Sequence, residues 1–169
     1  TVGARLAGRE LEITTYRAER YDPSSRKPEV DFGDSLAGDL GRRDFTVNAM
    51  AVRLPDLSFV DLHGGLDDLA AKVLRTPGRA ADSFSDDPLR MMRAARFSAQ
   101  LAFSVTDDVI TAMTEQAPRL EIVSAERIRE ELVRIVMSPD PRRGLGLLVD
   151  TGLAPYVLPE LPLLRLEVD

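Results

Sequence analysis

The chain has 169 residues, of which 44% are hydrophobic, and a formal net charge of −6. This composition is typical of a globular protein with a real core, built as one medium domain or two small ones. The absence of cysteine excludes disulfides and thiolate metal sites, and the single His63 argues against a histidine-based metal site or triad. The sequence shows neither a membrane-length apolar run nor a signal-like start, so we expect a cytoplasmic protein with no membrane partner.

The charge distribution bears on nucleic-acid binding. A nucleic-acid binder usually carries a basic face, and the net negative charge argues against one. Most of the acidity lies late in the chain, however, because residues 101–169 contain 7 basic and 12 acidic side chains. Twenty of the 22 basic residues are arginine, whose planar fork suits phosphates and base edges. A genomic composition bias would give the same excess.

The first part of the chain predicts strands and loops. Residues 10–17 alternate as in a half-buried strand. The polar segment 18–34 predicts a long loop, and long loops in compact domains are often functional. Two short apolar runs around Pro55-Asp56 predict a β-hairpin at 50–62, and a helix is predicted at 66–74.

From Pro77 onward the pattern is mainly helical. We predict helices at 87–100, 106–117, 124–137 and 141–150. Ser124 is the expected N-cap of the third of these helices. Its apolar stripe consists of Ile128, Leu132, Ile135 and Val136. The sequence therefore predicts an α+β protein with a boundary near residue 77.

A stripe of arginines marks the helix at 87–100. At about 100° per residue, Arg90, Arg93 and Arg96 share one sector, and apolar residues cover most of the rest. Arg90 can pair locally with Asp86 or Asp87, but Arg93 and Arg96 have no acidic residue three or four positions away. A distant carboxylate of the same fold could pair with any one of them. For three arginines in a row, an anionic ligand is the favoured hypothesis.

Further charged residues are candidates for a site. Residues 41–50 place Arg42, Arg43 and Asp44 directly before residues typical of a core, which points to a ligand. Asp87 precedes a proline and is a good helix cap, a role that is compatible with ligand binding because a carboxylate has two oxygens. Glu10 and Glu12 have the spacing of a two-carboxylate metal site on one strand face, although most such pairs are solvated.

Four segments in this order and spacing resemble the motifs of a known family: RRDFTVNAMA, DLHGGLDDL, DDPLRMMRAARF and ERIREEL. They are similar to the class II nucleotidyltransferases of the polymerase β superfamily, which comprise bacterial CCA-adding tRNA nucleotidyltransferases and poly(A) polymerases. The resemblance runs from residue 11 to about residue 137. It implies an α+β fold with the remainder of a nucleotidyltransferase head at 1–77, a helical neck for base recognition and RNA binding at 78–137, and the start of a helical body at 138–169.

The resemblance also implies residue roles and partners. Arg43 and Asp44 would hold the incoming nucleotide, with Asp44 accepting a hydrogen bond from the ribose 2′-hydroxyl. Asp87 and Arg90 would read the base. Arg93 and Arg96 would complete the nucleotide site. The implied partners are CTP, ATP and the 3′ end of tRNA or another RNA.

The metal-binding motif of the family, a Gly-rich turn followed by an Asp-x-Asp pair for two Mg²⁺ ions, has no counterpart in this sequence. We expect it upstream of Thr1. The catalytic and metal residues are therefore expected outside this chain, with Mg²⁺ as cofactor of the full-length enzyme. Glu12 would at most support the metal carboxylates, and residues 1–169 alone are expected to be inactive.

The expected activity of the full-length protein is template-independent addition of C and A to tRNA 3′ ends. Poly(A) synthesis on general RNA shares every motif seen here and is the alternative activity. An RNA-binding remnant without catalysis is the alternative of another class.

Overall fold

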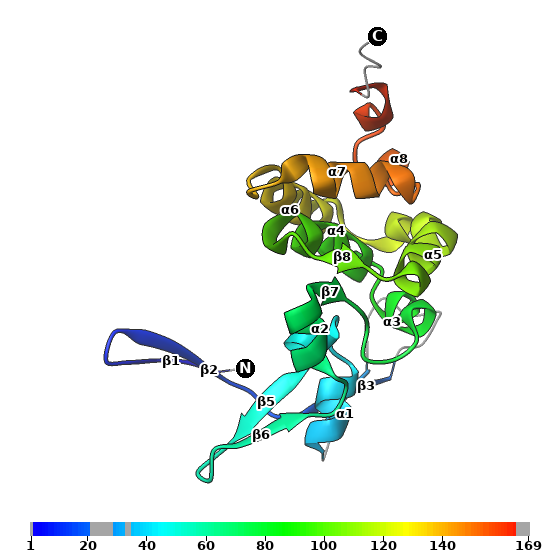
Figure 1. The fold of residues 1–169 in the computed structure, drawn as a ribbon. Coiled ribbons are helices and arrows are strands. Elements are labelled where there is room, and N and C mark those ends of the chain that lie inside the picture. The colour runs from blue at the N-terminus through cyan, green and yellow to red at the C-terminus, as the bar shows by residue number, and fades with distance from the viewer. Residues whose placement is uncertain (1, 21–28, 33–34, 165–169) are drawn as a thin grey trace. The chain divides into compact units, whose positions relative to one another are not determined.

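The structure, a computed structural model, describes residues 2–20, 29–32 and 35–164 (Figure 1). It contains two compact units, residues 1–42 and 43–169. The elements of the first unit are β1 (Val2–Leu6), β2 (Arg9–Ile13), β3 (Arg17–Arg20), β4 (Glu29–Phe32) and α1 (Leu36–Gly41). The α+β class predicted from the sequence is confirmed, while the boundary near residue 77 stays a prediction.

The first hairpin differs from the expected half-buried strand. Strands β1 and β2 pair antiparallel, with Val2 opposite Ile13, and Gly8 supplies a positive φ of 76° in the turn. Leu11 and Ile13 are 44% and 62% exposed. The prediction of burial is therefore wrong for this strand, which also ends at Ile13, four residues earlier than expected.

The predicted loop at 18–34 also contains regular structure. Strand β3 pairs antiparallel with β4, and Arg17 lies opposite Phe32. The rest of the loop, 21–28 and 33–34, lies outside the described residues. Helix α1 was not predicted, although Ser35 is a sequence signal for its start: the Ser35 hydroxyl accepts a hydrogen bond from the backbone N–H of Gly38 at 3.1 Å.

The second unit contains the helical core. Its elements are η1 (Thr46–Asn48), β5 (Met50–Arg53), β6 (Ser58–Asp61), α2 (Gly65–Ala71), β7 (Val73–Leu74), α3 (Ala80–Asp86), α4 (Leu89–Leu101), β8 (Ser104–Val105), α5 (Asp107–Gln116), η2 (Ala117–Ile122), α6 (Ala125–Val136), α7 (Pro141–Asp150), α8 (Ala154–Val157) and η3 (Leu161–Leu164). Among the described helices none is long and apolar enough to span a bilayer.

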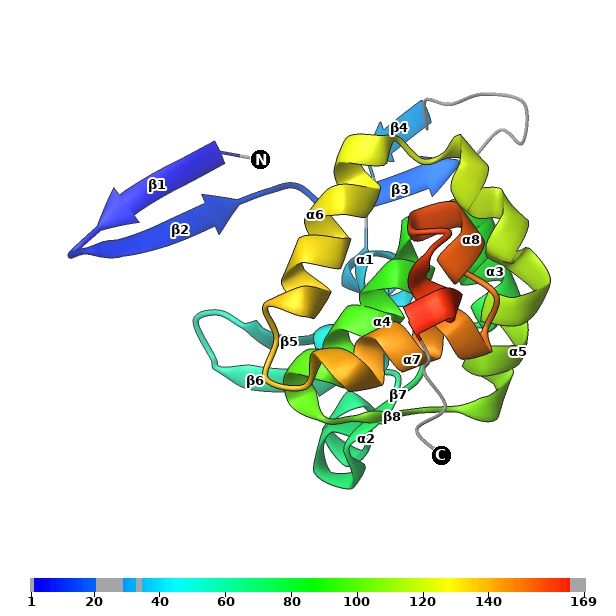
Figure 2. The ribbon, with the colours of Figure 1, turned by 90° about the horizontal axis from the view of Figure 1, so that it is seen from above.

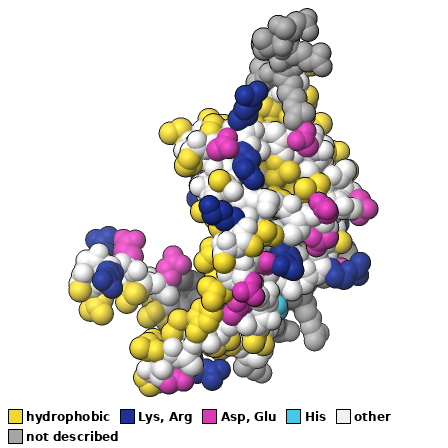
Figure 3. Space-filling view, viewed as in Figure 1, with side chains coloured by type: hydrophobic (Ala, Val, Ile, Leu, Met, Phe, Trp, Pro, Cys, Tyr) yellow, Lys and Arg dark blue, Asp and Glu magenta, His cyan; other side chains and the backbone are white. Residues whose placement is uncertain are grey.

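The hairpin predicted around Pro55-Asp56 is confirmed. Strands β5 and β6 pair antiparallel, with Met50 opposite Asp61. Figure 3 shows hydrophobic side chains gathered at the surface in this region. The exposed apolar residues of the hairpin and of the segment that follows it are Val52, Leu54, Leu57, Phe59, Leu62 and Leu66. The described residues therefore leave an apolar face uncovered here, a feature typical of interaction surfaces.

The helix predicted at 66–74 ends earlier than expected. Lys72 takes a left-handed conformation with φ 58°, and Val73–Leu74 then form β7, which pairs in parallel with β8. At the other end of α2, the Asp61 carboxylate accepts hydrogen bonds from the backbone N–H groups of Leu66 and Gly65, both at 2.9 Å. These bonds hold the pKa of Asp61 below its ordinary value and fix the start of the helix.

Helix α4 is the centre of the helical core. It packs against α6 and α7 and adjoins α3, as Figures 1 and 2 show. The predicted helices at 87–100, 106–117, 124–137 and 141–150 correspond to α4, α5, α6 and α7 within a few residues. Helix α3 was not predicted. Ser124 lies at the N-cap position of α6, but its side chain makes no capping hydrogen bond.

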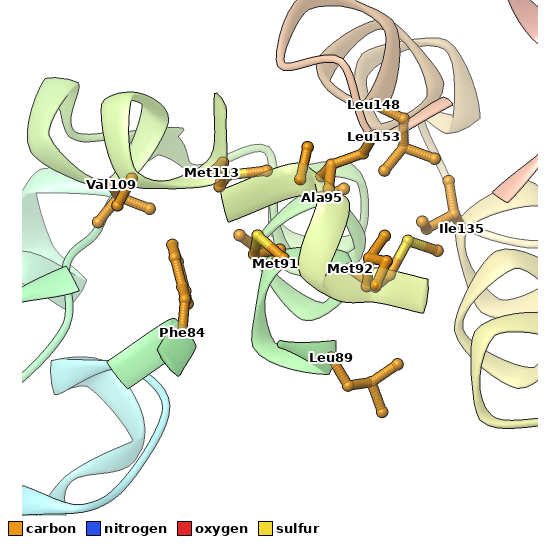
Figure 4. Packing of buried hydrophobic residues seen from close by; sticks show 14 of the residues in the cluster. Phe84, Leu89, Met91, Met92, Ala95, Val109, Met113, Ile135, Leu148 and Leu153 are labelled. Atoms are coloured by element: carbon orange, nitrogen blue, oxygen red, sulfur yellow. The ribbon is translucent and has the colours of Figure 1, made fainter. Parts of the chain in front are cut away.

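The core side chains come mainly from helices α3 to α8. Met91, Met92 and Ala95 of α4 are fully buried. Figure 4 shows them between Phe84 of α3 and Ile135 of α6. The apolar residues of α4 thus face the core, and its arginines lie on the remaining face of the helix.

The packing of α2 on the segment before β5 depends on a glycine. A Cβ atom on Gly65 would lie 2.2 Å from the backbone oxygen of Thr46. We predict that Gly65→Ala lowers the free energy of unfolding by about 1–3 kcal/mol, as other overpacked sites do. Urea unfolding measures the effect. The matched control is Gly78→Ala, where a Cβ meets nothing within 4 Å; equal stability of the two variants would contradict the prediction.

Candidate functional site

The segment Arg43–Asn48 is held in place by contacts of Thr46 and Phe45 with other parts of the fold. The Thr46 N–H donates to the backbone oxygen of Arg75 at 2.8 Å, and the Thr46 hydroxyl donates to Asp68 at 2.7 Å. Asp68 is buried and also binds the Arg75 guanidinium, which raises the pKa of Arg75. Phe45 is fully buried and its ring lies edge-on to Phe97 of α4 at 5.8 Å. This anchoring holds the neighbouring Asp44 in a fixed position.

The Asp44 carboxylate is only 6% exposed and is engaged on both oxygens. Oδ1 accepts from the backbone N–H of Phe45 at 2.9 Å and from the Asn48 amide at 3.2 Å. Oδ2 lies 2.7 Å from Nη2 of Arg93. A buried carboxylate needs such partners, because an unpaired charge away from water is costly.

Arg96 has a partner of its own in α6. Its Nε lies 2.7 Å from Oε2 of Glu131, and these side chains are 11% and 7% exposed. The Arg96 guanidinium also lies over the Phe97 ring, 4.2 Å from the centroid, a cation–π arrangement. Burial lowers the pKa of Arg96, and the Glu131 carboxylate opposes that shift.

Asp87 and Arg90 lie at the start of α4. Asp87 Oδ1 accepts from the backbone N–H of Leu89 at 3.2 Å, so its expected capping role is confirmed. Its Oδ2 lies 3.3 Å from Nη2 of Arg127 in α6. Arg90 is 9% exposed and its Nη1 donates to the Ser83 hydroxyl of α3 at 2.8 Å.

The structure thus brings the predicted site residues together in two groups along α4. Arg93 and Arg96 lie over the Phe97 ring with Asp44 paired to Arg93, and Asp87 and Arg90 lie at the beginning of the helix. Arg43 is exposed and directly precedes Asp44. The roles assigned to these residues from the resemblance stay predictions.

The structure shows partners for two arginines of the stripe. The alternative of distant carboxylates in the same fold is realised, because Asp44 and Glu131 pair with Arg93 and Arg96. The anionic ligand stays a prediction. A signal for Glu131 was present in the sequence. It lies three residues after Ile128 and four before Ile135, on the apolar face of α6, where an acidic residue calls for a buried partner.

Metal binding has no support from side-chain clusters. In the described part of the chain, no group of three or more His, Asp or Glu residues is placed to hold a metal ion. Glu10 and Glu12 lie on the exposed strand β2, where Glu10 is paired with Arg5. Among the described residues there is thus no such carboxylate cluster, and Mg²⁺ stays a prediction for the full-length enzyme.

Comparison with known proteins gives the context of this arrangement. Residues 1–75 match a sequence family described as the poly(A) polymerase head domain. Residues 102–164 match one described as the probable RNA- and SrmB-binding site of polymerase A. The CCA-adding enzyme of Streptococcus gordonii is 44% identical over 154 residues, which cover 90% of this chain and 38% of that enzyme.

The chain belongs to the family of CCA-adding enzymes and poly(A) polymerases. The CCA-adding enzyme of Latilactobacillus sakei is 43% identical over 150 residues, covering 88% of this chain and 38% of its own length. Among solved structures, the Bacillus stearothermophilus CCA-adding enzyme in complex with CTP matches with a TM-score of 0.84 and 34% identity. That match covers 96% of this chain and 40% of the enzyme.

A second solved relative is the Thermotoga maritima CCA-adding enzyme complexed with tRNA. It matches with a TM-score of 0.68 and 31% identity over 74% of this chain and 31% of its own length. The chain therefore spans well under half the length of the family members it matches.

The buried pair of Arg96 and Glu131 generates a prediction about stability. Glu131→Gln keeps the shape of the side chain but leaves the buried Arg96 charge without its counterion. We expect the free energy of unfolding to fall by about 2–4 kcal/mol. Chemical denaturation measures it. Glu130→Gln, an exposed neighbour on α6, is the control and should change stability by less than about 0.5 kcal/mol; equal effects would show that the pair contributes little.

Proposed function

We propose that the protein containing this chain is a template-independent RNA nucleotidyltransferase that adds C and A to tRNA 3′ ends from CTP and ATP. In this proposal Arg43, Asp44, Asp87, Arg90, Arg93 and Arg96 form the nucleotide site. The observation that carries it is the placement of Arg93 and Arg96 over one aromatic ring of α4, with Asp44 paired to Arg93, in a chain with 44% identity to a CCA-adding enzyme.

The ribose is assigned to Asp44. A carboxylate offers about four lone-pair positions. The hydrogen bonds from Phe45 and Asn48 use two of them at Oδ1, and Arg93 lies beside Oδ2 in an ion pair. Oδ2 accepts no hydrogen bond from the described residues, so it is the oxygen assigned to a donor such as the ribose 2′-hydroxyl. Because the three contacts fix the carboxylate, a nucleotide that binds there meets an acceptor already in place, without an ordering cost.

The base is assigned to Asp87 and Arg90. Cytosine and adenine both present an amine donor beside a ring-nitrogen acceptor, whereas uracil and guanine present a carbonyl beside an N–H donor. A carboxylate that accepts and a guanidinium that donates suit the first pair and leave the second pair mismatched. Asp87 is 23% exposed and therefore reachable, and Ser83 orients the Arg90 side chain, which is 9% exposed.

The triphosphate is assigned to the arginines. Arg93 is 37% exposed although it is paired with Asp44, and the exposed Arg43 precedes the same aspartate. Charge-assisted hydrogen bonds from guanidinium groups are the strong contacts for phosphate. Arg96 is largely buried against Glu131, so its proposed role is to add positive charge to the nucleotide site.

Mg²⁺ is proposed as a cofactor of the full-length enzyme, as in-line phosphoryl transfer in this superfamily implies. The described residues form no site for it, so the role assigned to this chain is to select and orient the nucleotide. We further propose a cytoplasmic location and the division into head (1–77), neck (78–137) and start of the body (138–169).

Poly(A) synthesis is the second candidate, because both matched sequence families are described by poly(A) polymerase names. The test is incubation of the full-length protein with tRNA ending before C-C-A, with an unstructured RNA, and with each nucleotide in turn. Addition of C and A to the tRNA alone supports the proposal, and A addition to both RNAs supports poly(A) synthesis. RNA binding without any transfer would leave the RNA-binding remnant.

A prediction about the sugar follows from Asp44. Asp44→Ala in the full-length protein should reduce the preference for CTP over dCTP by about 1–3 kcal/mol, the cost of a lost charged hydrogen bond. The measurement is kcat/KM for both nucleotides. Asp44→Asn keeps the shape beside Arg93 and serves as the second variant. If both variants lose activity with CTP and dCTP equally, Asp44 is only a structural partner of Arg93.

A prediction about the base follows from Asp87. Asp87→Ala should lose activity with both CTP and ATP. Asp87→Asn should also lose selectivity against UTP and GTP, yet keep the melting temperature, because asparagine caps helices as well as aspartate does. Steady-state kinetics with four nucleotides and thermal unfolding check both statements. Retained C and A selectivity with lost thermal stability in the alanine variant would make Asp87 a helix cap alone.

A further inference from the structure

The contact between Asp87 and Arg127 joins the start of α4 to the first turn of α6. Nη2 of Arg127 lies 3.3 Å from Oδ2 of Asp87, while Oδ1 of Asp87 accepts from the Leu89 N–H. Each carboxylate oxygen thus has one partner from a different element. These two contacts together fix the plane of the carboxylate, which the cap alone would not do.

Stability is a poor explanation of this contact. The Arg127 and Asp87 side chains are 54% and 23% exposed, and ion pairs of this exposure contribute little to folding. Arg127 is the third residue of α6, where the positive end of the helix dipole disfavours a cation. The position is therefore unfavourable for the helix itself.

We propose that Arg127 is a positioning residue for base selection, acting through Asp87. This inference rests on the proposed function of Asp87 as the acceptor for the exocyclic amine of cytosine and adenine. Arg127 holds Oδ2 so that its remaining lone pair points along a fixed direction. Base discrimination depends on that direction because hydrogen bonds weaken steeply as they bend.

The proposal differs from a simple gate. If Arg127 merely blocked Asp87 until a nucleotide displaced it, removal of Arg127 would strengthen binding of CTP and ATP. If Arg127 orients Asp87, its removal weakens the preference for C and A over U and G. Loss of Arg127 therefore strengthens the binding of CTP and ATP if it is a gate, and lowers the preference for C and A over U and G if it is a positioning residue.

The experiment uses the full-length protein and tRNA primers that end before C-C-A. We would measure kcat/KM for CTP, ATP, UTP and GTP in Arg127→Met, with Arg127→Lys as the conservative variant. The matched control is Arg129→Met, an exposed arginine two residues further along α6. The same substitution at Arg127 in an Asp87→Asn background completes a double-mutant cycle.

We expect Arg127→Met to reduce the ratio of C and A to U and G incorporation about fivefold, the effect of one well-oriented hydrogen bond. Arg127→Lys should retain most of the selectivity, and Arg129→Met should retain all of it. In the Asp87→Asn background, the change at Arg127 should have no further effect. Melting temperatures of the variants show whether folding is intact.

Three results would overturn the inference. Tighter binding of CTP and ATP by Arg127→Met would identify a gate, and an equal loss with all four nucleotides would identify a structural contact. In both cases the effects of Asp87 variants on selectivity would leave the proposed function standing. If Asp87 variants themselves leave base selectivity unchanged, the proposed base site fails, and the role of Arg127 fails with it.

Discussion

The ion pair between Asp44 and Arg93 is the contact on which the site depends. It connects the segment before the β5–β6 hairpin to the middle of α4, and the carboxylate is almost completely buried. Burial of the carboxylate makes the pair demanding, because the Asp44 charge without Arg93 would be costly. The surrounding bonds of Thr46 and the edge-on contact of Phe45 with Phe97 keep the two charges together.

The arginine face of α4 is preorganised rather than flexible. Arg90 is held by Ser83, Arg93 by Asp44 and Arg96 by Glu131, so each long side chain has lost its freedom before any ligand binds. Ordering arginines on binding would cost conformational entropy at each residue. In the proposed function this entropy cost falls on folding and not on ligand binding. The carboxylate partners also reduce the net positive charge of the arginine face, in a protein whose overall charge is negative.

Sequence patterns correctly predicted the features of the fold that depend on residues close together in the chain. The Pro55-Asp56 turn, the helical periodicity of α4 to α7 and the cap at Asp87 depend on neighbouring residues, and the structure confirms them. The partners of Arg93 and Arg96 lie on other elements, so spacing along the chain could not identify them. The predicted burial of one face of β2 was wrong for the same reason. Alternation along the sequence predicts which residues share a face of a strand, but not whether another element covers that face.

Helix α4 also sets the distance between the two ends of the proposed site. Asp87 lies just before α4 in an extended conformation, and Arg93 lies four residues after Leu89, the first residue of the helix, which corresponds to a rise of about 6 Å. The start of α4 therefore holds Asp87, the proposed base-reading carboxylate, and the same helix carries the arginine that pairs with Asp44, the proposed ribose acceptor. Any movement that rotates or shifts α4 displaces both groups together. In the proposed function, selection of the base and of the sugar are thus coupled by the packing of one helix against α6 and α7.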